Sequence, residues 1–237
     1  MKNLGNTWAT GSGIFETMRV EDGKVFALHR HHCRAQETAA KVGISIPTEE
    51  FVTEASYEVI TAEDFKVGRL RWHFDKAGEF TISYTEFEDP VAPANLMIFD
   101  ERKSDFEIQR KEFPYKNLEL LDIARAANFD DGIIVRSDGQ VAETSMATLL
   151  LRIGGQWVTP PLSSGILNGV VRALVLEAGL AQVKKIEIQE LAQVRSGILL
   201  TSLRNAQNIG SIDGRELAID NEKCAEIHKL MNQFKGR

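Results

Sequence analysis

The sequence predicts an α/β protein of the α+β type with two domains, and three observations lead to this prediction. The chain has 237 residues, 43% of them hydrophobic and 26% charged, which suffices for one large core or two modest ones. Strand pairs and helical stretches fill its first half, whereas strands and helices alternate in its second half. A polar, charged segment, residues 100–105, separates the halves. We therefore expect a small N-terminal domain, residues 1–103, and a larger C-terminal domain, residues 104–237.

Turn and cap signals delimit the elements of the first half. Asp22-Gly23 is a strong hairpin signal between two β-like runs. A helical pattern ends at Gly43, and the next begins with Thr48 followed by two glutamates, as helix starts prefer. The expected elements are strands over 13–20 and 24–28, helices over 31–42 and 48–61, strands over 68–74 and 79–86, and a strand over 96–99.

The second half shows the same kinds of signal. Gly154-Gly155 marks a hairpin, and Gly179 ends an amphipathic stretch. The expected elements are a strand over 106–113, a helix over 118–127, a strand over 132–136, a hairpin of 146–153 and 157–159, a helix over 169–178, strands over 183–188 and 197–201, and a helix over 221–234.

Composition disfavours several classes of function. A formal charge of −6 and a pI near 5.5 provide no basic surface for nucleic acid, although a small anionic ligand remains compatible. The only cysteines, Cys33 and Cys224, and an amino terminus without an apolar run argue against a secreted disulfide protein. No segment approaches the ~20 apolar residues of a membrane span. We expect a cytoplasmic protein that binds neither membranes nor nucleic acid.

Three stretches have residue types suited to a bound cofactor. Residues 165–172, Gly-Ile-Leu-Asn-Gly-Val-Val-Arg, lead into a helix whose amides could bind an anion, or form an ordinary loop. Lys116 stands at an expected strand-to-helix corner, where partial burial would make its amine nucleophilic; most lysines are instead solvated. Glu143 precedes an apolar strand, where it is either a surface cap or a partner for a protonated pyridine nitrogen.

Several cationic side chains are candidates for anion binding. Arg34, in His31-x-x-Arg34, could bind phosphate or carboxylate bidentately, or be a surface arginine. Arg69 and Arg71 alternate on one strand face and could hold a substrate carboxylate, or form a solvated face. The neighbouring cluster of His29, His31, His32 and Cys33 lacks the second half of a zinc motif, so we expect no metal.

The order of these motifs resembles the class IV aminotransferases, the fold-type IV pyridoxal-phosphate (PLP) enzymes. That family includes branched-chain and D-amino-acid transaminases and aminodeoxychorismate lyase. The matching stretches are residues 13–19 and 22–26, His31-x-x-Arg34, Lys116, residues 130–135, 139–145, 157–160 and 165–172, and residues 200–204.

The resemblance implies a D-amino-acid-aminotransferase-like fold with PLP between two domains, and a homodimer. It implies that Lys116 carries PLP as a Schiff base and that Glu143 contacts the pyridine nitrogen. The implied phosphate ligands are Arg34, the Gly169-Val170-Val171 helix start and Ser202. The implied substrate-binding residues are Arg71 and Arg204.

The sequence departs from the family pattern near its expected active site. The stretch from Lys116 to Asp130 is several residues shorter than usual, and Lys111 is the rival for the cofactor lysine. Thr148 stands where asparagine is usual, and no proline follows Leu203-Arg204. We therefore expect the substrate-side loop to differ from that of other members.

The same resemblance favours one reaction over another. A threonine matching Thr17 is thought to assist elimination in the lyases, whereas branched-chain transaminases usually have Phe-Glu-Gly there. We therefore expect a 4-amino-4-deoxychorismate lyase of folate biosynthesis, which forms 4-aminobenzoate and pyruvate from a small amino substrate with carboxylates. The alternatives are a class IV aminotransferase acting on branched-chain or D-amino acids, and a non-catalytic binding protein of the same fold.

Overall fold

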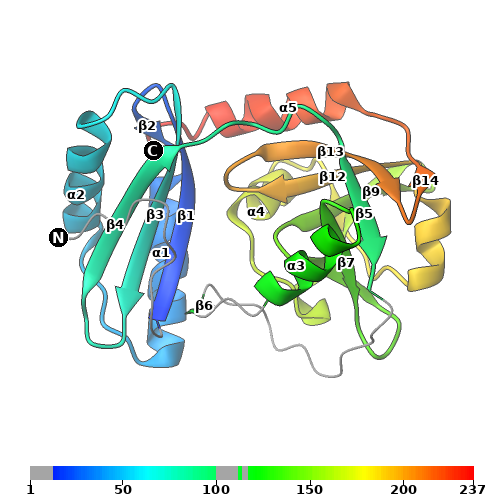
Figure 1. The fold of residues 1–237 in the computed structure, drawn as a ribbon, viewed down its shortest axis with the longest axis horizontal. Helices are drawn as coiled ribbons and strands as arrows, with labels where there is room; N and C mark the ends of the chain where they lie inside the picture. Colours follow the sequence, from blue (N-terminus) through cyan, green and yellow to red (C-terminus); the bar gives the residue numbers. More distant parts are fainter. Residues whose placement is uncertain (1–12, 100–111, 114–116) are drawn as a thin grey trace. The chain divides into compact units, whose positions relative to one another are not determined.

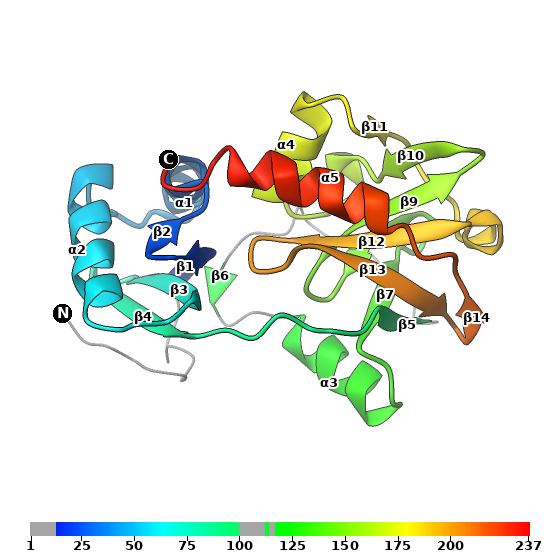
Figure 2. The ribbon, with the colours of Figure 1, turned by 90° about the horizontal axis from the view of Figure 1, so that it is seen from above.

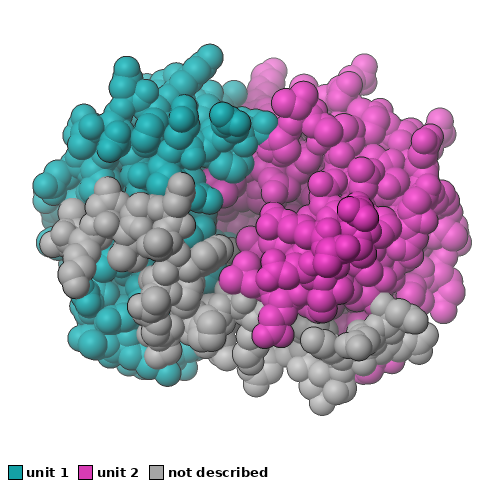
Figure 3. Space-filling model, viewed as in Figure 1, with its two compact units in different colours: residues 1–89, 110–115, 231–237 teal, residues 90–109, 116–230 magenta. Residues whose placement is uncertain are grey.

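The computed structural model describes residues 13–99, 112–113 and 117–237, with main chain only for 112 and 113. Contacts divide the chain into two compact units (Figure 3). Unit 1 comprises residues 1–89, 110–115 and 231–237, and unit 2 comprises residues 90–109 and 116–230. The expected domain boundary after residue 103 falls outside the described residues, but the described segment just before it, residues 90–99, belongs to unit 2.

Unit 1 contains a five-stranded antiparallel sheet with the order β2-β1-β3-β4, and β6 pairs with β1 (Figure 1). Its strands are β1 (Gly13–Glu21), β2 (Lys24–Val25), β3 (Val67–Asp75), β4 (Phe80–Glu86) and β6 (Glu112–Phe113). The register of β1 on β3 runs from Gly13 opposite Asp75 to Glu21 opposite Val67. The two hairpins expected in this half are therefore confirmed.

Two helices cover one face of this sheet, α1 (Leu28–Val42) and α2 (Glu49–Thr61). The Thr48 hydroxyl caps α2 by accepting a hydrogen bond from the Phe51 amide, as its sequence predicts. The buried core combines both helices with alternate strand residues: Ile14, Met18, Val20, Leu28, Ala35, Ala39, Val52, Ala55, Ile60, Leu70, Trp72, Phe74, Ile82 and Tyr84. Because strand side chains alternate, the intervening residues share the opposite face of the sheet.

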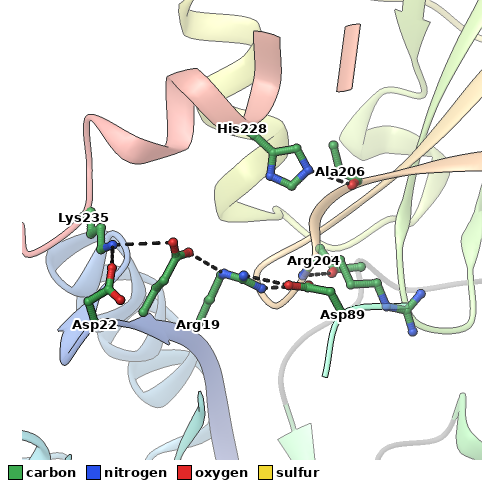
Figure 4. A network of polar contacts seen from close by, with 9 residues as sticks. Arg19, Asp22, Asp89, Arg204, Ala206, His228 and Lys235 are labelled. Atoms are coloured by element: carbon green, nitrogen blue, oxygen red, sulfur yellow. Dashed lines mark hydrogen bonds and ion pairs between the residues drawn. The ribbon is translucent and has the colours of Figure 1, made fainter. Parts of the chain in front are cut away.

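The C-terminal residues of unit 1 are tied to the β1–β2 turn (Figure 4). The Lys235 ammonium lies 2.6 Å from an Asp22 carboxylate oxygen and 3.6 Å from one of Glu21. Glu21 also accepts a hydrogen bond from Arg19, whose guanidinium binds the Asp89 carboxylate through two 2.8 Å hydrogen bonds. This chain of charges joins β1 to Asp89, the last residue of unit 1's first segment, and to Lys235 in its C-terminal segment.

Unit 2 contains a nine-stranded mixed sheet with the order β11-β10-β9-β12-β13-β5-β7-β8, and β14 pairs with β13 (Figure 2). Its strands are β5 (Ala94–Ile98), β7 (Asp131–Val135), β8 (Val141–Thr144), β9 (Thr148–Ile153), β10 (Gln156–Thr159), β11 (Gln182–Val183), β12 (Ser196–Thr201), β13 (Asn205–Ile212) and β14 (Arg215–Glu216). β5 pairs in parallel with both β7 and β13, and β10 pairs in parallel with β11. The other strand pairs of this sheet are antiparallel.

Apolar side chains of this sheet form a buried core, in which Leu96, Ile133, Leu149, Leu151 and Ile209 are all at 0% exposure. A second cluster packs α3 (Leu118–Ala126) against β7 and β8. The remaining helices are α4 (Val170–Glu177), α5 (Asn221–Asn232) and the short 3-10 helices η1 (Leu162–Ser164) and η2 (Ile188–Gln193). None of the helices in the described part of the chain is both long and apolar enough to span a membrane.

Several described elements differ from their sequence expectations. The strands β8 and β13 were not expected, and β6, at the end of the strand expected over 106–113, pairs with β1 of unit 1. The strand expected over 96–99 is found as β5, but it pairs in parallel with β7 and β13 of unit 2 instead of joining the first-half sheet. The strand expected over 183–188 is shorter than predicted: β11 ends at Val183, and η2 begins at Ile188. Between them the chain forms only an isolated antiparallel bridge, Glu187 with Gln140, flanked by a hydrogen bond from the Val141 amide to the Ile186 carbonyl.

Candidate functional site

A buried carboxylate lies at the end of β8 in unit 2. Glu143 is 4% exposed, and its Oε2 accepts a hydrogen bond from the Leu167 amide at 3.2 Å. Leu167 is two residues before Gly169, so this contact brings Glu143 to the loop that opens α4. The structure thus places together two of the predicted cofactor-binding elements, which are 26 positions apart in the sequence.

The turn that follows Glu143 is held by a second buried carboxylate, Asp131 at the start of β7. Asp131 accepts hydrogen bonds from the hydroxyls of Thr144 and Ser145 and from the amides of Ser145 and Met146. These contacts fix the backbone between β8 and β9. The position of Glu143 therefore depends on Asp131, although the two side chains are not bonded to each other in any contact described here.

The first turn of α4 presents backbone amides without side-chain capping. Gly169 is the N-cap, with an extended backbone and no side-chain cap hydrogen bond. The amides of Val170 and Val171 belong to the first turn, where no helical carbonyl can accept from them. A Cβ at position 169 would lie 3.3 Å from the Thr148 hydroxyl, so glycine keeps this approach open. The helix start is suited to an anion.

A buried guanidinium supports the same helix start. Arg172 is 4% exposed and donates from Nη2 to the Pro160 carbonyl at 2.7 Å. Burial lowers the pKa of Arg172, and the negative charge of Glu143 acts in the opposite direction. Arg172 thus connects Pro160, the residue after β10, to α4, and its positive charge interacts with the negative charge of Glu143.

The turn between β12 and β13 contains Ser202 and Arg204, both half-buried. The Thr201 hydroxyl accepts a hydrogen bond from the Arg204 amide at 3.0 Å, and Gln207 accepts one from Arg204 Nη1 at 2.7 Å. These contacts hold the turn on which the Ser202 hydroxyl is carried. His228 of α5 bonds the nearby Ala206 carbonyl (Figure 4).

The donor set of unit 2 fits the expected cofactor. A buried carboxylate suits a protonated pyridine nitrogen, while helix-start amides and a hydroxyl suit a phosphate. The predicted cofactor lysine, Lys116, and its rival Lys111 lie outside the described residues. Their roles remain predictions.

In unit 1, the face of the sheet opposite the helices is polar and basic. Thr17 on β1 lies directly across from Arg71 on β3, and the Thr17 hydroxyl accepts a 3.4 Å hydrogen bond from Arg71 Nε. Arg71 is 9% exposed; burial, and then the like charge of Arg69, lowers its pKa to about 10. Arg69 donates to the Thr85 hydroxyl at 3.1 Å. The structure therefore brings the predicted Thr17 and Arg71 together.

Arg34 has a different setting from the one its sequence position suggested. It is buried at the interior of unit 1 and donates from Nε and Nη2 to the two carboxylate oxygens of Glu16, at 2.8 and 2.5 Å. His31 lies 2.7 Å from the same carboxylate. Sequence reasoning missed Glu16, although a charged residue between the core positions Ile14 and Met18 is a signal of a buried partner.

The other two histidines at the start of α1 contact residues at or just before the start of α2. His29 Nδ1 lies 2.8 Å from Glu49, and His32 Nε2 lies 3.1 Å from the Pro47 carbonyl. Within the described ranges, no group of three or more His, Cys, Asp or Glu side chains is arranged to hold a metal ion.

Known proteins share this sequence pattern and fold. The family model for amino-transferase class IV matches residues 13–212. The "Putative aminodeoxychorismate lyase" of Schizosaccharomyces pombe is 27% identical over 175 residues, which cover 71% of this chain and 74% of that protein. The "Putative branched-chain-amino-acid aminotransferase" of Methanocaldococcus jannaschii is 26% identical over 254 residues, covering 95% and 86%.

A solved structure has the same fold. The "Putative 4-amino-4-deoxychorismate lyase" of Legionella pneumophila superposes with a TM-score of 0.82 at 20% identity, covering 93% of this chain and 90% of that one. The fold-type IV architecture expected from the sequence is thereby confirmed. Together with the family match over residues 13–212, the motifs and their arrangement lead to one conclusion: this chain belongs to the class IV aminotransferase family.

Proposed function

We propose that this enzyme is a PLP-dependent 4-amino-4-deoxychorismate lyase, which forms 4-aminobenzoate and pyruvate. The observation that carries the proposal is the Thr17–Arg71 pair on the basic face of unit 1. The names of the Schizosaccharomyces and Legionella relatives support the same activity. The resemblance to this family is also our reason to propose a homodimer.

The residues of the family motifs would hold the cofactor. Lys116 would bind it covalently, and Glu143 would pair with its pyridine nitrogen. The amides of Val170 and Val171, the Ser202 hydroxyl and Arg34 would bind its phosphate. When bound, PLP supplies an electron sink for the carbon that bears the substrate nitrogen.

The basic face of unit 1 favours a substrate with two carboxylates. Each product of the lyase, 4-aminobenzoate and pyruvate, carries one carboxylate, so their common precursor carries two. Arg69 and Arg71 project from the same face of β3, two residues apart, and a guanidinium is well suited to a carboxylate. A branched-chain amino acid has one carboxylate and an apolar side chain, for which such a face is a poor match.

Thr17 is placed to act as a proton donor. Because its oxygen accepts the Arg71 Nε–H, the hydroxyl proton of Thr17 is directed away from Arg71. The nearby positive charge also favours partial negative charge on that oxygen when the proton is shared. Thr17 would donate its proton to the ether oxygen of the enolpyruvyl group while the bond from that oxygen to the ring carbon breaks, and the side chain would leave as the enol of pyruvate, which tautomerises to pyruvate. The Lys116 amine would take the proton from the carbon bearing nitrogen, and the ring would become aromatic. The proton removed from the carbon bearing nitrogen balances the one that Thr17 gives up.

An aminotransferase acting on branched-chain or D-amino acids is the second candidate. The Methanocaldococcus relative favours it, since the alignment covers 95% of this chain. In that reaction Lys116 would still move a proton at the carbon bearing nitrogen, but Thr17 would have no leaving group to protonate.

The two candidates give different products. We would incubate the holoenzyme with 4-amino-4-deoxychorismate and measure pyruvate and 4-aminobenzoate, and separately measure keto-acid formation from branched-chain and D-amino acids. The lyase proposal predicts both products in equal amounts, and a loss of about 10²-fold in rate for Thr17→Val, the size of a general-acid contribution. Thr17→Ser should retain most of the activity. Rapid keto-acid formation without pyruvate would overturn the proposal in favour of the transaminase.

A further inference from the structure

A cluster of three buried polar side chains joins β1 to α1 inside unit 1. Glu16 and His31 are each 1% exposed, and Arg34 is 8% exposed. Glu16 occupies the helix-facing side of β1, where its neighbours Ile14 and Met18 belong to the hydrophobic core. A carboxylate in such a position is costly unless its hydrogen-bonding capacity is filled.

The cluster fixes the guanidinium of Arg34 in one plane and one direction. Glu16 Oε1 accepts from Arg34 Nε at 2.8 Å, and Glu16 Oε2 accepts from Arg34 Nη2 at 2.5 Å. His31 Nδ1, 2.7 Å from Oε2, holds the carboxylate from another side. A bidentate contact of this kind sets the orientation of the opposite guanidinium edge, formed by Nη1 and Nη2.

The charge state of the cluster is equally defined. Burial alone would raise the pKa of Glu16, but the charge and hydrogen bonds of Arg34 and His31 lower it from 4.5 to about 2. Glu16 is therefore a carboxylate throughout the physiological range. A buried ion pair contributes little net stability compared with apolar residues of similar size. The orientation that Glu16 imposes on Arg34 therefore explains the cluster better than stability does.

We propose that Glu16, supported by His31, is a positioning residue that orients Arg34 toward the phosphate of the cofactor. This inference rests on the proposed function, in which Arg34 is a phosphate ligand. The cluster would act on the phosphate through Arg34, which is the residue that Glu16 holds.

The test compares two ligands that differ by the phosphate alone. PLP would be removed from the purified holoenzyme, and the dissociation constants of PLP and of pyridoxal, which lacks the phosphate, would be measured by spectroscopic titration. The variants are Glu16→Gln, which cannot accept from both Arg34 nitrogens, and Glu16→Asp, which keeps the charge but has a shorter reach. Glu21→Gln is the matched control, because Glu21 lies on the same strand and pairs with Arg19 and Lys235.

We expect Glu16→Gln to raise the dissociation constant of PLP about tenfold or more, because one charge-assisted hydrogen bond is lost. The dissociation constant of pyridoxal should not change. Glu16→Asp should weaken PLP less, and it is the variant to use if Glu16→Gln fails to fold. In an Arg34→Met background, Glu16→Asp should have no further effect on PLP affinity, because Glu16 acts through Arg34.

Other outcomes overturn the inference and are distinguishable from one another. Equal weakening of PLP and pyridoxal would mean that Glu16 is merely structural. Unchanged PLP affinity in both Glu16 variants would mean that Arg34 is not oriented by Glu16 for the phosphate. Failure of the wild-type protein to bind PLP would overturn the proposed function itself, and the inference with it.

Discussion

Both units bury a carboxylate beside their candidate site, but they hold it by different means. In unit 1, Glu16 is fixed by the side chains of Arg34 and His31, of which the first is a cation. In unit 2, Asp131 is fixed by hydroxyls and backbone amides of the single turn that contains Thr144 and Ser145. The first arrangement orients a charged side chain, whereas the second orients a stretch of backbone.

This difference indicates how each unit prepares its part of the site. Orienting Arg34 requires a partner from another element, so β1 and α1 must both be folded before the guanidinium is in place. Asp131 instead holds the backbone after Glu143, through contacts between the β8–β9 turn and the start of β7. We therefore expect the ion cluster of unit 1 to be more sensitive to mutation than the network of hydroxyls and amides around Asp131 in unit 2.

The largest effect is expected when Glu16 is removed. Glu16→Ala leaves Arg34 and His31 buried without their shared acceptor, and breaking a buried pair in this way costs about 3–5 kcal/mol of unfolding free energy. Urea denaturation at neutral pH measures this loss. The control Glu21→Ala, on the same strand but half-buried, should lower the unfolding free energy much less. Equal losses in the two variants would show that the buried cluster stabilises the protein no more than a partly exposed ion pair.

Acid should unfold the wild-type protein partly through the same carboxylate. The pKa of Glu16 in the folded protein, about 2, is below its ordinary value of 4.5, so its stabilising contribution is complete above pH 4.5. That contribution is lost as the pH falls from 4.5 through 2, and its full size is about 3 kcal/mol. Unfolding free energies of wild type and Glu16→Gln should therefore converge as the pH is lowered. Parallel pH profiles of the two proteins would contradict the assignment.

A smaller effect is expected in the network around Asp131 in unit 2. Asp131→Asn keeps the shape but offers one acceptor oxygen where the turn uses two, so we expect a loss of about 2 kcal/mol. Asp122→Asn, on the exposed face of α3, is the control. Thermal or urea denaturation measures both. A loss as large as that of Glu16→Ala would remove the distinction between the units.

The smallest effect is expected at a surface ion pair. Lys184 Nζ lies 2.5 Å from Glu190, but Lys184 is exposed, so solvent screens the pair. Lys184→Ala should change the unfolding free energy by about 0.5 kcal/mol or less. A loss of several kcal/mol in the same denaturation experiment would show that proximity of charges, and not burial, decides these contributions.

The sequence predicted elements better than their partners. Thr48 and Gly43 marked helix ends correctly, because capping depends on the local chain. The strand around Leu96 was predicted, but it was placed with the first half of the chain, whereas it pairs with strands of unit 2. Periodicity does not identify a partner strand that begins at Ile209, more than 100 residues away. Parallel pairing leaves no hairpin signal that could have corrected the assignment.

The candidate site shows the same division. Glu143 and the helix start at Gly169 were predicted from motifs, Thr17 from the family resemblance, and Arg71 from strand alternation. The partners that hold these residues were not predicted, because Asp131 and Glu16 act through contacts between elements distant in sequence. Glu16 alone gave a usable signal, a charge at a core position of an otherwise apolar strand face.

The most direct test of the account is to identify the lysine that carries the cofactor. The purified protein would be saturated with PLP, reduced with borohydride to trap a Schiff base, digested, and mapped by mass spectrometry. The account predicts that the cofactor is trapped on Lys116. Trapping on Lys111 would contradict this site assignment, and the absence of any adduct would contradict the proposal of a PLP-dependent lyase altogether.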